Sequence, residues 1–217
     1  MNDSTPPGAT DTAPVQLSVA VSARHVHFTQ ATVDRLFGAG HELRIRTPLL
    51  QPDQYAADET VTLVGPLGRL PNVRVVGPTR DEDQVELSRT DQILLGIDAP
   101  YRASGDLAGT PGIVIEGPAG RVALDHGVIG VLRHIHMSPA VADVLGLKDH
   151  DRVDVAVNRE DRHLTFGDVI VRVSPSYRLE LHLDTDEGNA AGLRVSEVAL
   201  LLGRVVRSEA SGPASVY

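Results

Sequence analysis

The stretch SARHVH at residues 22–27 is echoed by LRHIHMS at residues 132–138, and this pair decides how the fold is interpreted. In each copy an arginine precedes a His-x-His pair, and the two pairs lie 109 positions apart. On a β-strand, side chains at i and i+2 lie on the same face, about 6.6 Å apart. Each pair therefore places two imidazoles on one strand face, where both can converge on one atom.

Each His-x-His pair is followed by residues that predict a short helix. Thr29 is the expected N-cap of a helix that Gly38 ends. After the second pair, Ser138 is the expected cap, Pro139 takes the first helical position, and Gly146 ends the helix. The positions that agree in register are Arg24, His25, His27, Ala31, Asp34 and Leu36 in the first copy and Arg133, His134, His136, Ala140, Asp143 and Leu145 in the second. The agreement indicates an internal duplication and predicts two related small barrels whose His-x-His strands approach each other.

Short strand-like runs occupy most of the chain. They include VQLSVAV, ETVTLVG, NVRVVG, QVELS, GIVIEG, GVIGVL, DRVDVAV, DVIVRVS and RLELHLD. Turn residues separate the runs at the spacing of an all-β barrel or sandwich, and GPLGR at 65–69 is nearly repeated as GPAGR at 117–121. The fold class is therefore predicted to be mainly β, with short helices capping the barrels. The apolar segment SEVALLLGRVV at 196–206 fits either a terminal helix or a strand.

Composition excludes several classes of function. The 217 residues are 41% hydrophobic and 23% charged, as expected of a soluble globular protein. No run approaches the roughly 20 apolar residues of a membrane span, and the N-terminus lacks a signal-peptide pattern, so a cytoplasmic location is expected. The chain has no cysteine, so a metal site must use nitrogen and oxygen ligands. A net charge of -9 argues against nucleic acid or anionic lipid as a partner.

The histidines carry the functional prediction. A lone histidine on a strand is more often structural than a ligand, but His-x-His recurs as a way to offer two neutral nitrogens to zinc. In LELHLDTDE, three leucines face one side, which leaves Glu180, His182 and Asp184 on the other. Glu86, on a strand run, is the best carboxylate to complete a site. So many histidines exceed what one open site needs, and they predict two metals or one metal surrounded by further histidines.

Seven motifs occur in order with the lengths that link them. They are VSARHVH, QPDQYAADETV, RVVGPTRDEDQVELSRTD, YRASGDL, GPAG, GVIGVLRHIHMS and HLDTDEGNAA. Through them, residues 15–192 resemble the PduL-type phosphate acyltransferases, the phosphate propanoyltransferases associated with bacterial microcompartments. The resemblance implies two β-barrels that exchange strands, and a dinuclear zinc centre that interconverts acyl-CoA plus phosphate with acyl phosphate plus CoA. A short-chain substrate, propanoyl- or acetyl-CoA, and a homodimer are expected with it.

Residue roles follow from the resemblance. One zinc would be held by His25, His27 and Glu86, with the CoA sulfur able to take the open place. The second would be held by His134, His136 and His182, leaving room for phosphate. Arg80 of GPTR matches the family's phosphate-contacting arginine, and Ser22, Arg74 and Asn189 stand where the family contacts CoA.

The domain boundaries are expected to reflect the strand exchange. Residues 15–23 plus 132–206 should form one barrel and residues 24–131 the other. Residues 1–14 should be a disordered lead, and residues 207–217 a flexible tail. The lead contains three prolines and no apolar stripe, so it does not predict the encapsulation helix of microcompartment proteins, and a place in the microcompartment lumen stays an alternative.

Direct attack of phosphate on the thioester is the predicted reaction. The chain has no cysteine, GxSxG elbow or P-loop, so an acyl-enzyme and a nucleotide-driven step are unsupported. Two rivals stay open. One is a zinc-dependent thioesterase or other hydrolase that uses metal-bound water, and the other is a non-catalytic barrel that binds metal or a partner.

Overall fold

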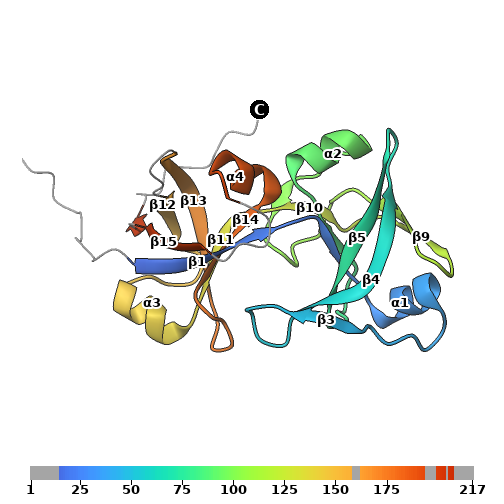
Figure 1. The fold of residues 1–217 in the computed structure, drawn as a ribbon, viewed down its shortest axis with the longest axis horizontal. Coiled ribbons are helices and arrows are strands. Elements are labelled where there is room, and N and C mark those ends of the chain that lie inside the picture. The colour runs from blue at the N-terminus through green and yellow to red at the C-terminus, as the bar shows by residue number, and fades with distance from the viewer. Residues whose placement is uncertain (1–14, 158–161, 194–198, 204, 208–217) are drawn as a thin grey trace, which may run out of the picture. The chain divides into compact units, whose positions relative to one another are not determined.

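The computed structural model describes residues 15–157, 162–193, 199–203 and 205–207 (Figure 1). The chain divides into two compact units. Unit 1 comprises residues 1–20, 133–182 and 197–217, and unit 2 comprises residues 21–132 and 183–196. The expected lead over residues 1–14, and residues 208–217 of the expected tail, lie outside the described residues. The domain boundaries stated above stay a prediction. Among the described residues, no helix combines the length and apolar character that crossing a membrane requires.

Unit 1 is built on a seven-stranded sheet with the order β15-β1-β14-β11-β13-β12-β16. Its strands are β1 (Val15–Ser22), β11 (His134–Met137), β12 (Arg152–Val157), β13 (Leu164–Val173), β14 (Glu180–Asp184), β15 (Ala199–Gly203) and β16 (Val205–Arg207), and its helix is α3 (Pro139–Leu145). Strand β1 runs antiparallel to β15, so the first described strand joins the last third of the chain in one sheet (Figure 1). The predicted strand exchange is therefore present.

The apolar segment at 196–206 contributes strands rather than a helix. Residues 199–203 form β15 on β1, and β16 pairs antiparallel with β12. Residues 196–198 and 204 lie outside the described residues. Of the two alternatives left open by the sequence, the strand is the one observed.

Unit 2 is built on a nine-stranded sheet with the order β7-β10-β6-β2-β5-β4-β8-β9, and β3 pairs with β4. The strands are β2 (His25–His27), β3 (Ile45–Pro48), β4 (Tyr55–Val64), β5 (Arg69–Gly77), β6 (Gln84–Glu86), β7 (Tyr101–Arg102), β8 (Ile113–Glu116), β9 (Arg121–Leu124) and β10 (Val128–Val131), with helices α1 (Gln30–Phe37), α2 (Arg89–Leu95) and α4 (Thr185–Ala190). Apolar side chains from β2, β4, β5, β8, α1 and α2 fill its core. The fold is mainly β, with two curled, barrel-like sheets and short helices, as predicted.

The near-repeated turns have the same packing role. GPLGR joins β4 to β5, and GPAGR joins β8 to β9. The Leu67 N–H donates to the Leu95 carbonyl (3.0 Å) at the end of α2, and the Ala119 N–H donates to the Leu36 carbonyl (2.9 Å) in the last turn of α1. A Cβ added at Gly65 would lie 2.2 Å from the Leu95 oxygen, so only glycine permits this approach. Each turn therefore docks on the C-terminal end of a helix that follows a site strand.

Candidate active site

Four strands end in the same way, and their ends supply every predicted metal ligand. The sequences are HVHFT at 25–29, QVELS at 84–88, HIHMS at 134–138 and ELHLD at 180–184. The fifth residue of each is the N-cap of the helix that follows, and its side chain accepts a backbone N–H three residues on. We call each of these five-residue sequences a strand–cap segment and number its positions 1 to 5.

Positions 2 and 4 of every segment face a core. The position 2 side chains are Val26, Val85, Ile135 and Leu181, and all four are fully buried. The position 4 side chains are Phe28, Leu87, Met137 and Leu183, and they are buried as well. Because strand side chains alternate, positions 1 and 3 point to the opposite face. The alternation thus aims the polar residues of each segment away from the core and toward the cluster of its own unit.

The segments pair antiparallel within each unit. In unit 2, His25 faces Glu86 and His27 faces Gln84 across β2 and β6. In unit 1, the register sets position 1 against position 3 in the same way: His134 faces His182 and His136 faces Glu180 across β11 and β14. Four polar side chains meet in each unit, and three of them are predicted ligands.

The first cluster, in unit 2, comprises His25, His27 and Glu86. Their donor atoms lie within 4.8 Å of one another. The Nε2 atoms of His25 and His27 lie 3.3 Å and 3.9 Å from the Glu86 carboxylate. Each Nδ1 lies near a backbone carbonyl, that of Ala23 (2.9 Å) or Val76 (3.1 Å). Because a carbonyl only accepts, each Nδ1 carries the proton and leaves the Nε2 lone pair for the cluster.

Burial keeps His27 in the form that binds metal. Desolvation, with a smaller effect from neighbouring His25, lowers the pKa of His27 well below its usual value. The imidazole is therefore neutral, as a metal ligand must be.

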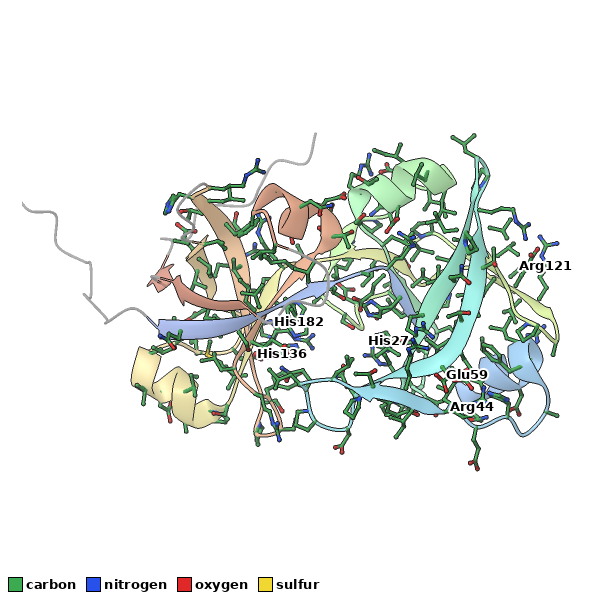
Figure 2. All side chains as sticks on the ribbon, viewed as in Figure 1. His27, Arg44, Glu59, Arg121, His136 and His182 are labelled. Atoms are coloured by element: carbon green, nitrogen blue, oxygen red, sulfur yellow. The ribbon has the colours of Figure 1, made fainter. Side chains whose placement is uncertain are left out.

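The second cluster, in unit 1, comprises His134, His136 and His182. Their donor atoms also lie within 4.8 Å of one another. The three ring centroids are 4.6–4.9 Å apart, and Figure 2 shows His136 beside His182. The His136 ring also stacks on Tyr177 at 4.2 Å. Burial, followed by the neighbouring His182 and His134, lowers the pKa of His136 to about 2. Three imidazoles thus face one point.

His136 provides a test of whether this cluster fits a metal. Both of its ring nitrogens are buried and make no hydrogen bond within the described part of the chain. A buried polar group without a partner costs about 1–3 kcal/mol, and a cation bound to the lone pair would remove much of that cost. One cluster offers three nitrogen ligands, and the other offers two nitrogens and a carboxylate oxygen. Such three-ligand sets without sulfur suit zinc in an open site. The donor sets of both clusters therefore fit a divalent metal.

Arg80 lies next to the first cluster. Its backbone N–H donates to the Phe28 carbonyl (2.8 Å), and its guanidinium Nη1 donates to Ser104 Oγ (3.2 Å). Its charge is among the causes that lower the pKa of His27. The side chain borders a hollow of about 370 Å³ that Thr79 and Gln84 also line. A positive group beside an open hollow and a metal-suited cluster is an arrangement that can hold an oxyanion.

Gln84 and Ser104 are site residues that the sequence did not predict. Gln84 Nε2 donates to Glu86 Oε1 (2.5 Å) and to Ser104 Oγ (2.8 Å), while its Oε1 accepts the Gly105 N–H (2.8 Å). Ser104 in turn accepts from Arg80. The signal for Gln84 was its place at position 1 of a strand–cap segment. Ser104 lies in an irregular loop and had no comparable signal.

The three residues predicted to contact CoA have different surroundings. Ser22 Oγ lies 3.3 Å from His25 Nδ1, beside the first cluster. Arg74 pairs in register with His25, but its Nη1 donates to the carbonyls of Ala57 (3.0 Å) and Asp58 (2.8 Å). Asn189 is exposed on α4. Their contact with CoA stays a prediction.

The fold and the clusters define a class of β-protein in which paired strand ends assemble a three-ligand, metal-suited cluster in each of two barrel-like units. A profile of the phosphate propanoyltransferase family matches residues 18–194. The chain therefore belongs to the phosphate propanoyltransferase family, a family of acyltransferases, and the resemblance drawn from the sequence motifs is confirmed.

Relatives that carry the name phosphate propanoyltransferase match most of the chain. The Thermotoga maritima protein is 53% identical over 184 residues, which cover 85% of this chain and 88% of the relative. The Salmonella typhimurium protein is 53% identical over 176 residues, covering 81% and 83%. The Shewanella putrefaciens protein is 46% identical over 177 residues, covering 82% and 83%. The family profile over residues 18–194 includes all six residues of the two clusters.

Proposed function

We propose that this protein is a phosphate acyltransferase that interconverts a short-chain acyl-CoA and phosphate with an acyl phosphate and CoA. The observation that carries the proposal is the position of Arg80 beside the cluster of His25, His27 and Glu86. The name of the relatives supports propanoyl-CoA as a substrate. We include acetyl-CoA because the sequence resemblance implies short acyl chains.

Zinc in both clusters is part of the proposal. His25, His27 and Glu86 would hold one ion, and His134, His136 and His182 would hold the other. Bound zinc supplies a Lewis acid that stabilises negative charge on a departing thiolate and on a carbonyl oxygen. The neutral, buried state of His27 and His136 supports this assignment.

The protein's own residues bind and orient the reactants. Arg80 presents a planar pair of N–H donors that matches two phosphate oxygens, and Ser104 holds the guanidinium in place. A phosphate oxygen then attacks the thioester carbonyl carbon. The new C–O bond forms, the C–S bond breaks, and its electron pair leaves with the CoA sulfur. Holding the two reactants together supplies the rate without a covalent enzyme intermediate, in keeping with a chain that has no cysteine.

A thiol-release assay tests the reaction class. Zinc-loaded protein is given acetyl-, propanoyl- or butanoyl-CoA with and without phosphate, and free CoA is measured. We expect release that depends on phosphate. Equal release without phosphate would overturn the proposal and favour the hydrolase that uses metal-bound water. Absence of turnover in zinc-replete protein would favour the non-catalytic barrel.

The assembly and location that the resemblance implies are also proposals. We expect a homodimer, which sedimentation of the purified protein would check. We also propose a cytoplasmic location, with the microcompartment lumen as the alternative. Co-purification with microcompartment shells would reject the first and support the second.

A further inference from the structure

Each unit has four polar positions where two strand–cap segments pair, and the proposed zinc sites use three of them. The fourth is Gln84 in unit 2 and Glu180 in unit 1. Both residues occupy position 1 of the later segment in their pair, so they are equivalent by register. Glu180 is only 4% exposed. The burial of a carboxylate at this position needs a physical explanation.

Gln84 shows what the fourth position does. Its amide donates to Glu86, the ligand two residues further along the same strand. Glu180 makes the corresponding contact in unit 1, because its Oε2 lies 2.8 Å from Nε2 of His182. An ionised carboxylate only accepts hydrogen bonds, so the imidazole donates Nε2–H. The Nδ1 lone pair of His182 is then the one left for a metal.

Glu180 supports the cluster without belonging to it. Among the described residues, the donor atoms that lie within 4.8 Å of one another in unit 1 are those of the three histidines. Glu180 instead faces His136 across the strand pair and contacts His182 along its own strand. Its position is that of the carboxylate that commonly accepts the second N–H of a metal-bound histidine.

We propose that Glu180 is the positioning residue of the second metal cluster, which fixes the ring and the tautomer of His182. The proposal rests on the proposed zinc sites. It also relates the two clusters by geometry. In unit 2 the amide of Gln84 contacts the carboxylate ligand Glu86, whereas in unit 1 the carboxylate of Glu180 contacts the imidazole ligand His182.

Zinc release to a chromogenic chelator tests the role of Glu180. Wild type, Glu180→Ala and Glu180→Gln are loaded with two zinc equivalents, and the affinity of each equivalent is measured. We expect Glu180→Ala to weaken one equivalent by about 10–100-fold and to leave the other unchanged. Glu180→Gln should recover most of the loss, because an amide oxygen still accepts the ring N–H and glutamine occupies the equivalent position in unit 2.

Glu59 offers a matched control. It is 5% exposed and lies 2.8 Å from Nε2 of His41, a carboxylate–imidazole pair of the same length outside both clusters. Glu59→Ala should lower stability and leave both zinc equivalents as tight as in wild type. Weakened zinc binding in this control would show that loss of any buried carboxylate is enough, and would overturn the specific role of Glu180.

The outcomes separate this inference from the proposed function. If wild type binds two zinc ions and Glu180→Ala holds both with unchanged affinity, the inference alone is overturned. If wild type binds no zinc through His134 and His136, the zinc proposal is overturned together with the inference. If Glu180→Ala does not fold, the same measurement is made on Glu180→Asp. This variant keeps a carboxylate but moves it back by one methylene. A weakened equivalent then supports the role, and an unchanged one overturns it.

Discussion

Arg24 and Arg133 precede the two His-x-His pairs at equivalent positions, yet they are anchored differently. Arg24 Nη1 donates to Asp91 Oδ1 (2.9 Å) in the first turn of α2. Arg133 Nε donates to the Gly167 carbonyl (2.7 Å), and its guanidinium lies over the Phe166 ring. Both contacts tie the start of a site strand to a neighbouring element. The repeated arginine is thus accounted for by structural anchoring, while Arg80 lies beside the first cluster.

The six metal-suited residues were predictable from the sequence because each lies on a strand, where every second side chain points to the same face. Gln84 and Glu180 were not assigned roles, because a single polar residue on a strand face has many possible partners. Their function depends on which strand pairs with which, and in what register. The alternation of polar and apolar residues along one strand does not specify its partner strand or its register.

Arg80 carries the first prediction. Arg80→Ala should reduce turnover at least 10²-fold, because losing a charge-assisted bidentate contact costs about 3 kcal/mol of transition-state stabilisation. Arg80→Lys should recover little, since an ammonium does not reproduce the planar fork. Steady-state kinetics with varied phosphate at saturating acyl-CoA measure the effect, and zinc content should stay at the wild-type level.

A surface arginine serves as the control for this experiment. Arg121 is exposed and lies 3.9 Å from Glu116, and Figure 2 labels it. Arg121→Ala should leave turnover within about twofold, as expected for an exposed pair. An unchanged phosphate dependence in Arg80→Ala would remove the phosphate role.

Glu59 gives a pH-dependent prediction. Burial raises the pKa of the Glu59 carboxyl, but hydrogen bonds from His41 and the Arg44 backbone outweigh it, and the net pKa is lowered. A lowered folded-state pKa adds stability that is present above the ordinary value of about 4.3 and is lost as pH falls through the folded-state value. Glu59→Gln should therefore cost about 1–3 kcal/mol at pH 7 and progressively less in acid.

Urea unfolding at a series of pH values checks this prediction. The exposed neighbour Glu42 provides the control. Glu42→Gln should change the free energy of unfolding by less than about 0.5 kcal/mol at every pH. A difference between wild type and Glu59→Gln that stays constant down to acid pH would contradict the proposed ionic contribution.

At the scale of elements, the strand–cap segment is the repeating part of the molecule. The caps and ends of α1 and α3 were predicted from the sequence, and the structure confirms Thr29, Gly38, Ser138 and Gly146 in those places. The segments that lead into α2 and α4 were not recognised as copies. They keep the alternation of polar and apolar positions and the N-cap residue, but they share few residue identities with the histidine segments. A buried position requires an apolar side chain without specifying which one.

The docking turns lead to a prediction about Gly65. A Cβ at this position would meet the Leu95 carbonyl oxygen and push the turn off the end of α2. Gly65→Ala should therefore destabilise the protein by about 1–3 kcal/mol. Leu67→Ala, at a side chain that is 81% exposed, leaves the backbone contact in place and should cost less than about 0.5 kcal/mol. Thermal unfolding of both variants compares them, and equal stability would contradict the close-approach argument.

At the scale of the whole molecule, the mainly β class was predictable from the short alternating runs. The pairing of β1 with β15 was not, and it was anticipated only through the family resemblance. Ser18 Oγ donates to the Leu179 carbonyl (3.0 Å) across 161 positions of sequence. Contacts of such range depend on the assembled sheet rather than on local propensity.

The metal content is the prediction that belongs to this scale. Elemental analysis should give close to two zinc ions per chain, because each cluster has a full set of three ligands of its own. The double change His134→Ala and His136→Ala should remove one equivalent and spare the other. Loss of both equivalents together in folded protein would contradict independent clusters.

The pairing of β1 with β14 and β15 also sets an order of events during synthesis. Strands β2 to β10 leave the ribosome in succession and can complete their sheet, with His25, His27 and Glu86 in place, while unit 1 is still being translated. At ordinary translation rates, β1 waits on the order of ten seconds for its partners. Throughout that interval its apolar side chains, Leu17 and Val19 among them, have no sheet to join. The nascent chain therefore carries an aggregation-prone strand ahead of unit 2, the kind of segment that chaperones shield.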